Sequence, residues 1–339
     1  MTAIVPSEVQ SRPTRTVPLA LRAAPLGYAA LLGVGLVAPF FVYPVFLMKV
    51  LCFGLFACAF NLLLGYVGLL SFGHAAFYGS AAYATAYAAK AWGAPPLSVI
   101  LFGMLAAGLL GSAIGAIAIR RQGIYFAMIT LALAQMFYFF CMQVPFTGGE
   151  DGIQAVPRGT LLGLFDLRDT LTLYFFVFAL FLAGFLLVGR AIHSPLGQVL
   201  KAIRENELRA VSLGYKPDQY KLIAFILSAT LSGLAGALHA LVFQLASLTD
   251  VHWSLSGEVV LMTLLGGLGT EYGPLAGALI LVTLEQYLAP FGAWVTVAQG
   301  ACFVLCVLVF RRGVAGALGD WRRRRRAGLR AHSAAERPD

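Results

Sequence analysis

A long stretch that is almost free of charge constrains this chain more than any other feature. No acidic residue occurs between Glu8 and Glu150. The basic residues between positions 25 and 147 are Lys49, Lys90, Arg120 and Arg121. The chain of 339 residues is 60% hydrophobic and 12% charged, whereas soluble domains carry about 25% charged residues. Because such a stretch offers too little polar surface to water, the sequence predicts an all-α fold, a polytopic transmembrane helical bundle.

Apolar segments of membrane-spanning length recur along the chain. A span needs about 20 mostly apolar residues, and 8–10 spans are predicted, with eight or ten favoured by the charges of the loops. The segments 257–271 and 275–289 are short and flank the sequence GTEYGP. We expect a broken or re-entrant pair there, buried in protein or lining a cavity. The candidate spans are 25–47, 48–66, 67–89, 97–119, 123–144, 172–189, 220–244, 257–271, 275–289 and 291–310.

Basic residues predict the orientation of the spans. Lys and Arg accumulate on the cytoplasmic side, and an N-terminus in the cytoplasm also places Arg120 and Arg121 there. The formal net charge of +9 is concentrated in the tails and one internal loop. This distribution argues against a nucleic-acid partner. The arginine run 322–326 is expected to bind anionic membrane lipids. The predicted regions are a cytoplasmic tail 1–24, a transmembrane domain 25–310 with a cytoplasmic loop 190–219, and a basic cytoplasmic tail 311–339.

One polar segment, SPLGQVLKAIRENELRAVSLG, lies between two predicted spans. We expect one amphipathic cytoplasmic helix there, capped by Ser194, with Pro195 at its first position, and closed by Gly214. An interfacial helix on lipid and a solvated connector are the alternatives. Mixed charges favour a protein partner, because helices on lipid carry a mainly basic polar face. The residues expected at this contact are Lys201, Arg204, Glu205, Asn206, Glu207 and Arg209.

Four stretches carry a family resemblance, in the same order along the chain. The segment 194–238, with the polar helix and the span that follows it, resembles the corresponding part of LivM-type permeases, the membrane subunits of bacterial branched-chain amino-acid ABC importers. The resemblance runs from about Asn61 to Phe310. The other stretches are NLLLGYVGLLSFGHAAFYGSAAY at 61–83, GIYFAMITLALAQ at 123–135 with TGGEDGI at 147–153, and SGEVVLMTLLGGLGTEYGPLAGA at 256–278.

The resemblance implies that the helix 194–214 is the coupling element that docks on an ATP-hydrolysing subunit. Ala210 and Gly214 keep the Ala-x3-Gly spacing of the EAA loop of ABC importers. Leu208 and Arg209 replace the leading Glu-Ala pair of that loop, with Glu207 one position earlier. The chain has no G-x-x-x-x-G-K-[ST] phosphate loop. We therefore expect ATP and Mg to bind to partner subunits, no cofactor or metal on this chain, and no enzymatic activity of its own.

The resemblance also implies partners, location and substrate. It places the chain in the bacterial inner membrane with both termini in the cytoplasm. The implied partners are a second, homologous LivH-type permease subunit, two ABC ATPase subunits and an extracytoplasmic substrate-binding protein. The loop with Thr147, Gly148 and Gly149 would help to receive the ligand at the outer face. The implied substrates are branched-chain or other small hydrophobic amino acids, with urea, short amides or aromatic acids as alternatives.

Polar residues in apolar segments are the candidates for the translocation pathway, because the charged ends of an amino acid need donors and acceptors. His74 is equally well explained as a neutral histidine bonded to a backbone carbonyl, and Thr130 and Gln135 as hydrogen-bond partners between helices. Glu285 is costly inside a span, and a pathway role and helix pairing are equally supported for it. The candidates are Asn61, Ser71, Gly73, His74, Thr130, Gln135 and Glu285.

Two other classes of protein are weighed against the permease. An ion-coupled secondary transporter would need no ATPase partner and would more often place an acid in the pore, for which Glu285 is the candidate. A membrane-embedded enzyme is disfavoured, because the five histidines show no metal-ligand spacing such as HExxH. No pairing of a nucleophile with a base is evident in the sequence either.

Overall fold

The computed structural model describes residues 20–161, 165–292, 297, 300–301 and 304. The predicted tail 311–339, residues 1–19 of the predicted tail 1–24 and most of the predicted span 291–310 lie outside the described residues. Within the described part, helices dominate, as an all-α bundle requires. The strands are pairs of two residues each, β1 (Ile153–Gln154) with β4 (Leu245–Ala246) and β2 (Thr160–Leu161) with β3 (Phe165–Asp166), both antiparallel.

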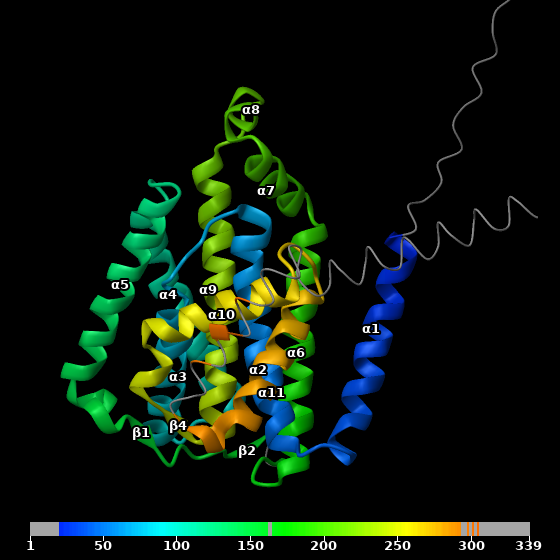
Figure 1. Ribbon diagram of the computed structural model, residues 1–339. Coiled ribbons are helices and arrows are strands. Elements are labelled where there is room, and N and C mark those ends of the chain that lie inside the picture. Colours follow the sequence, from blue (N-terminus) through cyan, green and yellow to red (C-terminus); the bar gives the residue numbers. More distant parts are fainter. Residues whose placement is uncertain (1–19, 162–164, 293–296, 298–299, 302–303, 305–339) are drawn as a thin grey trace, which may run out of the picture.

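The helices alternate in direction through the bundle (Figure 1). Five of the described helices are long and apolar enough to cross a membrane: α2 with the turn that extends it, α4, α5, α6 and α9. Shorter apolar helices are α10, α11 and the segment Gly27–Phe40. The α-helices are α1 (Ala20–Val37), α2 (Pro44–Asn61), α3 (His74–Trp92), α4 (Pro96–Ala118), α5 (Ile124–Gln143), α6 (Thr170–His193), α7 (Pro195–Glu205), α8 (Glu207–Ser212), α9 (Pro217–Phe243), α10 (Trp253–Gly266) and α11 (Gly273–Leu288).

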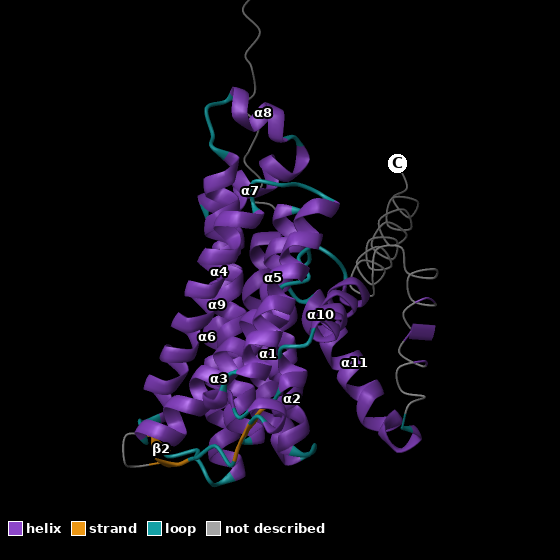
Figure 2. Ribbon diagram, turned by 90° about the vertical axis from the view of Figure 1, so that its left-hand side faces the viewer, coloured by secondary structure: helices purple, strands orange, loops and turns teal. Residues whose placement is uncertain are grey.

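The two ends of the bundle differ. The short helices α7 and α8 stand at one end, here called the α8 end (Figures 1 and 2). The connection between α4 and α5 lies at this end too, because Gln122 donates to Glu207 of α8 over 2.9 Å. The loop between α5 and α6 lies at the opposite end, where β1 pairs with β4 after α9 (Figure 1). The basic loops therefore share one end, as the charge pattern predicts.

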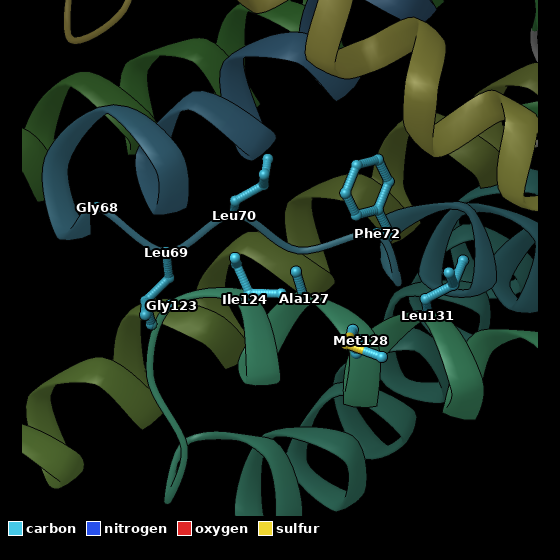
Figure 3. Close-up of a pocket in the computed structure, with 9 residues that line it drawn as sticks. All are labelled: Gly68, Leu69, Leu70, Phe72, Gly123, Ile124, Ala127, Met128 and Leu131. Carbon is cyan, nitrogen blue, oxygen red and sulfur yellow. The ribbon is translucent and has the colours of Figure 1, made fainter.

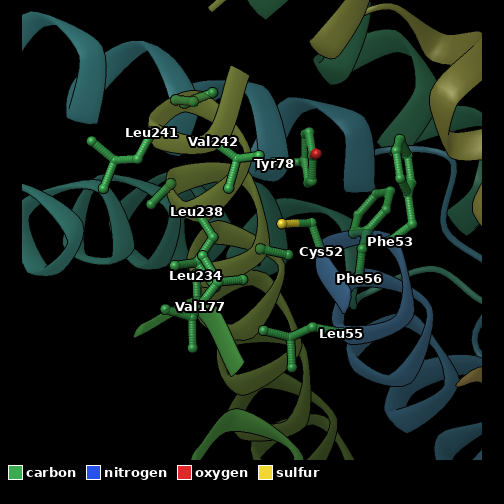
Figure 4. Packing of buried hydrophobic residues seen from close by; sticks show 14 of the residues in the cluster. Cys52, Phe53, Leu55, Phe56, Tyr78, Val177, Leu234, Leu238, Leu241 and Val242 are labelled. Atoms are coloured by element: carbon green, nitrogen blue, oxygen red, sulfur yellow. The ribbon is translucent and has the colours of Figure 1, made fainter. Parts of the chain in front are cut away.

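The core lies where α2, α3, α6 and α9 meet. Figure 4 shows Phe56 of α2, Tyr78 of α3 and Leu238 of α9 packed together, and all three are buried. The close approach of α9 to α3 depends on Gly236, since an added Cβ there would lie 3.0 Å from the Tyr78 Cα atom. Small residues allow helices in membranes to approach in this way, so the glycine-rich segment of α9 serves packing.

Two predicted span boundaries are wrong by several residues. The sequence predicts spans 25–47 and 48–66, but the chain turns before Pro44, which occupies the first helical position of α2. Proline lacks an amide N–H and suits that position. The predicted span 67–89 is also interrupted. Residues 68–73 are not helical, and α3 begins only at His74.

A π-helical turn, Leu62–Val67, extends α2 before this irregular segment. Gly68 ends the turn in the left-handed region, with φ +83°, a conformation that glycine adopts at little cost. Its amide donates to the Leu63 carbonyl over 3.0 Å. Single π turns inside helices often mark functional sites, and this turn lies directly beneath α7.

Candidate functional site

The polar segment at the α8 end forms two helices, which corrects the expectation of a single helix over 194–214. Ser194 caps α7 by accepting from the Gly197 amide over 3.4 Å, and Gly214 has φ +87°, as expected. The chain breaks at Asn206, which has φ −157° and ψ 100°. The Asn206 side chain then accepts from the Arg209 amide over 3.0 Å and caps α8. Asparagine competes well for backbone donors at such caps, so it starts a new helix here.

The inner side of α7 contacts the π-helical turn. Arg204 donates a hydrogen bond from Nη1 to the Gly65 carbonyl. The Lys201 ammonium lies 5.4 Å from the centre of the Tyr66 ring, within the range of a cation–π contact. Both side chains were expected to face a protein partner. In the structure both side chains contact this chain's own bundle, and Arg204 is also exposed.

Glu207 also faces the bundle. Its carboxylate accepts from Lys221 of α9 over 2.6 Å and from Gln122 of the α4–α5 connection over 2.9 Å. Lys221 is buried, with a side chain 4% exposed. The carboxylate therefore holds α8 to both α9 and the start of α5. The sequence analysis did not predict a role for Lys221. A lysine early in an apolar span is nevertheless a signal of a paired charge.

The outer side of α8 is apolar. Leu208, Val211 and Leu213 are 84%, 52% and 69% exposed. Glu205 and Arg209 are exposed beside them. We call these five residues the outer α8 surface. Large apolar side chains rarely gather at an exposed tip unless they contact another surface. Of the remaining coupling candidates, Asn206 is an exposed cap and Ala210 is buried.

Asn61 anchors the connection between α10 and α11. Its side-chain amide donates to the Thr270 carbonyl over 2.8 Å and accepts from the Gly269 amide over 3.0 Å. The side chain is buried at the end of α2. An added Cβ at Gly65 would lie 2.7 Å from the Gly269 nitrogen. The π-helical turn and the 267–272 connection are therefore in close contact.

Four other pathway candidates gather where α3 begins. The Thr130 hydroxyl accepts from the Phe72 amide over 3.2 Å, and the Ser71 hydroxyl accepts from the Gly73 amide over 3.2 Å. His74 Nε2 lies 2.9 Å from the Ser228 hydroxyl, which itself donates to the Ala59 carbonyl. The histidine therefore donates from Nε2 to the Ser228 hydroxyl. In this arrangement these polar groups bond mainly to the chain's own backbone.

The irregular segment forms one wall of an apolar cavity of about 440 Å³. Figure 3 shows residues 68–72 crossing the first turns of α5, with side chains from both elements in the cavity wall. A polar cavity of about 430 Å³, which includes Arg204, Glu207 and Lys221, shares Gly68 and Gly123 with it. Both volumes fall in the range of small-molecule sites, about 300–1,000 Å³. The apolar cavity is lined by Gly68, Leu69, Leu70, Phe72, Gly123, Ile124, Ala127, Met128 and Leu131.

Two candidates lie away from this group. Gln135 is half-buried further along α5. Glu285 of α11 forms an ion pair with Lys49 of α2, at 3.1 Å, and the two side chains are 17% and 26% exposed. The ion pair joins α2 to α11 inside the bundle. Lys49 is a partner that the sequence reasoning missed, although it is the one charge in an otherwise apolar helix.

The predicted outer-face residues lie at the end opposite α8. Thr147 is buried, and its hydroxyl donates to the Val144 carbonyl over 2.6 Å. Gly148 and Gly149 both have positive φ, at 79° and 58°. Gly148 lines a cavity of about 270 Å³. Arg158 bonds to the last turn of α9, with Nη2 at 2.7 Å from the Val242 carbonyl, so the loop is fastened to the bundle.

The chain is similar in sequence to known permeases. The LivM permease of the high-affinity branched-chain amino acid transport system of Salmonella typhimurium is 28% identical over 276 residues, 73% of this chain and 64% of the relative. The Escherichia coli LivM is 27% identical over 271 residues, with the same coverage. A probable LivM of Methanocaldococcus jannaschii is 26% identical over 200 residues, 57% of each chain.

The match spans 64% of the length of each of the two bacterial relatives, less than two thirds. No solved structure matches the chain significantly. Among the described residues, no group of three His, Cys, Asp or Glu side chains is placed to hold a metal ion. Residues 44–310 match the family described as branched-chain amino acid transport system / permease component. That match covers most of the chain, which therefore belongs to this family of membrane permeases.

Proposed function

We propose that this chain is the membrane-spanning permease subunit of an ABC importer for branched-chain or other small hydrophobic amino acids. The observation that carries the proposal is the outer α8 surface, an exposed apolar tip flanked by Glu205 and Arg209 at the end of a membrane bundle. Such a tip suits docking into a cleft of a soluble protein. In this proposal the α8 end is cytoplasmic, the membrane is the bacterial inner membrane, and both termini lie inside.

The partners in this proposal divide the work. Two ABC ATPase subunits bind ATP and Mg and hold the outer α8 surface. An extracytoplasmic binding protein delivers the substrate to the end that carries Gly148 and Gly149. A second, LivH-type permease subunit completes the pathway. Closure of the ATPase subunits would displace α7 and α8, and rigid contacts to α9 through Glu207 would pass that movement to the spans.

The segment 68–73 supports a pathway along this face of the bundle. Its backbone is irregular, yet it follows a membrane-spanning helix and precedes another apolar one. Lipid cannot satisfy irregular backbone, which occurs at membrane depth only where protein covers it or water lines it. In this proposal the face made by this segment and α5 lines the pathway and contacts the second subunit. The leucine, isoleucine, methionine and phenylalanine side chains of the cavity suit an aliphatic substrate side chain.

The docking proposal is tested with Leu208→Glu in the complete importer. A charge at this apolar position is expected to abolish co-purification of the ATPase subunits and uptake of leucine, while the variant still accumulates in the membrane. Gln219→Glu adds the same charge at an exposed position of α9 at the same end and is the matched control. Normal co-purification and uptake with Leu208→Glu would refute docking through α8.

The substrate class is tested by competition. Uptake of labelled leucine into vesicles is expected to be inhibited by isoleucine and valine, and not by urea, acetamide or benzoate. Stronger inhibition by one of the latter would assign the permease to that substrate class instead.

The charged pair of Lys49 and Glu285 is the observation that favours an ion-coupled transporter as the second candidate. That candidate requires uptake that persists when the ATPase subunits are omitted.

A further inference from the structure

Arg204 occupies the junction between α7 and the irregular parts of the bundle. Its guanidinium donates to the Gly65 carbonyl within the π-helical turn. Its Cγ atom would lie 3.1 Å from a Cβ added at Gly68, and its Nη1 atom 3.7 Å from a Cβ added at Gly269. These two glycines leave room for the side chain. One arginine thus touches α7, the π-helical turn and the 267–272 connection.

The π-helical turn passes this contact on in two directions. Asn61, just before the turn, holds Gly269 and Thr270 through two hydrogen bonds. Gly68, just after the turn, begins the wall of the apolar cavity. The end of that wall is fixed to α5 by the bond from the Phe72 amide to the Thr130 hydroxyl. A displacement of Gly65 therefore reaches the cavity wall within three residues.

We propose that Arg204 is a positioning residue that transmits movement of α7 to the π-helical turn and so to the cavity wall at residues 68–72. The inference rests on the proposed function, because it assumes that an ATPase displaces α7. A planar guanidinium with several fixed donors suits this task, since it holds a carbonyl in one direction. Gly65 lies in the last turn of this helix, where carbonyls lack an intrahelical donor, and the Gly68 and Leu69 amides both donate to the Leu63 carbonyl.

Other contacts fasten α7 and α8 without Arg204. Leu200 and Ile203 of α7 are buried against the bundle, and Glu207 is paired with Lys221. Removing the guanidinium therefore leaves the helices in place and takes away the link to Gly65. Transmission and docking can be separated by experiment for this reason.

The test uses the complete importer in proteoliposomes with Arg204→Ala, Arg204→Lys and the control Arg190→Ala, an exposed arginine of α6 near the same end. For Arg204→Ala we expect normal co-purification of the ATPase subunits and ATP hydrolysis within about twofold of wild type. Uptake per ATP should fall roughly tenfold, the size expected when a charge-assisted hydrogen bond is lost from one of two states. Arg204→Lys should restore part of the coupling, and Arg190→Ala should match wild type.

A second readout follows the cavity wall directly. Met128→Cys, in a chain whose five native cysteines are replaced, places a thiol at a cavity position that is 61% exposed. We expect its rate of reaction with a maleimide to change on ATP binding in the wild-type background and to be insensitive to ATP with Arg204→Ala. A merely structural role would alter the rate equally with and without ATP.

The outcomes separate this inference from the proposed function. Wild-type uptake per ATP and an ATP-dependent cysteine rate in Arg204→Ala would overturn the role of Arg204 and leave docking through α8 intact. ATP-independent uptake by the wild-type complex would overturn the proposed function itself. If Arg204→Ala does not accumulate, uptake per ATP and the ATP dependence of the cysteine rate are measured with Arg204→Lys, which keeps the charge without the planar fork.

Discussion

Replacing Asn61 by alanine is expected to loosen the 267–272 connection from the end of α2. The alanine removes a donor 2.8 Å from the Thr270 carbonyl and an acceptor 3.0 Å from the Gly269 amide. The Asn61 side chain is buried. Both backbone groups would lose their partner at once.

The size of the effect follows from two limits. Hydrogen bonds between helices in a membrane contribute about 0.6 kcal/mol on average, which gives a lower value of about 1.2 kcal/mol for two bonds. A buried donor or acceptor left unsatisfied costs about 1–3 kcal/mol, so the expected loss in the free energy of unfolding is larger than this lower value. Because the connection lies near the α8 end, water can reach part of the freed backbone. We therefore expect a loss of about 1–3 kcal/mol in the free energy of unfolding.

The measurement is the unfolding of the purified chain in mixed micelles by added SDS, followed by circular dichroism. Thr283→Val is the matched control, because the Thr283 hydroxyl bonds only within its own helix, to the Leu279 carbonyl over 2.6 Å. The control is expected to change the free energy by less than about 0.5 kcal/mol. Equal unfolding of Asn61→Ala and wild type would refute the anchoring role.

Two further results are expected. Lys49→Met removes the cation beside Glu285 inside the membrane. The loss in the free energy of unfolding should lie between the ~1 kcal/mol of exposed pairs and the ~3–5 kcal/mol of broken buried pairs. The double variant Lys49→Met with Glu285→Gln should recover part of this loss in SDS unfolding. Equal loss in the single and double variants would contradict the pairing. Hydrogen bonds from Thr172 hold the pKa of Asp169, which caps α6, below its usual value. The stability that this cap contributes is therefore present above the unfolded pKa, about 3.9. It is lost as the pH falls through the lower pKa of the folded state. Asp169→Asn keeps a capping acceptor and should weaken the acid dependence of unfolding; an unchanged dependence would contradict this.

The membrane class and most spans could be predicted because they depend on local composition. A run of apolar residues must be helical in lipid whatever surrounds it, so α4, α5, α6 and α9 appear near their predicted ranges. The breaks were harder to place. The π-helical turn and the irregular segment 68–73 are stabilised by Asn61 and Thr130 through contacts that join distant parts of the chain.

The polar segment shows the same limit. Its charges predicted an exposed helix with a protein partner, and the segment does stand outside the bundle. Charge alone could not tell which side each residue faces, because that depends on contacts with Gly65, far away in the sequence, and with Lys221 in the following helix. Arg204 and Glu207 each bond to the bundle, although Arg204 stays exposed, and the apolar Leu208 and Val211 are exposed as well. The outer α8 surface therefore combines two predicted residues, Glu205 and Arg209, with apolar residues that the charge pattern did not indicate.

The central claim is that ATP hydrolysis by partner subunits drives transport through this chain. The most direct measurement is uptake of labelled leucine into proteoliposomes that contain this chain, the second permease subunit, both ATPase subunits and the binding protein. We expect uptake that requires ATP, stops when the ATPase subunits are omitted, and is lost with Leu208→Glu but kept with Gln219→Glu. Uptake that continues without ATPase subunits, driven by an ion gradient, would contradict it.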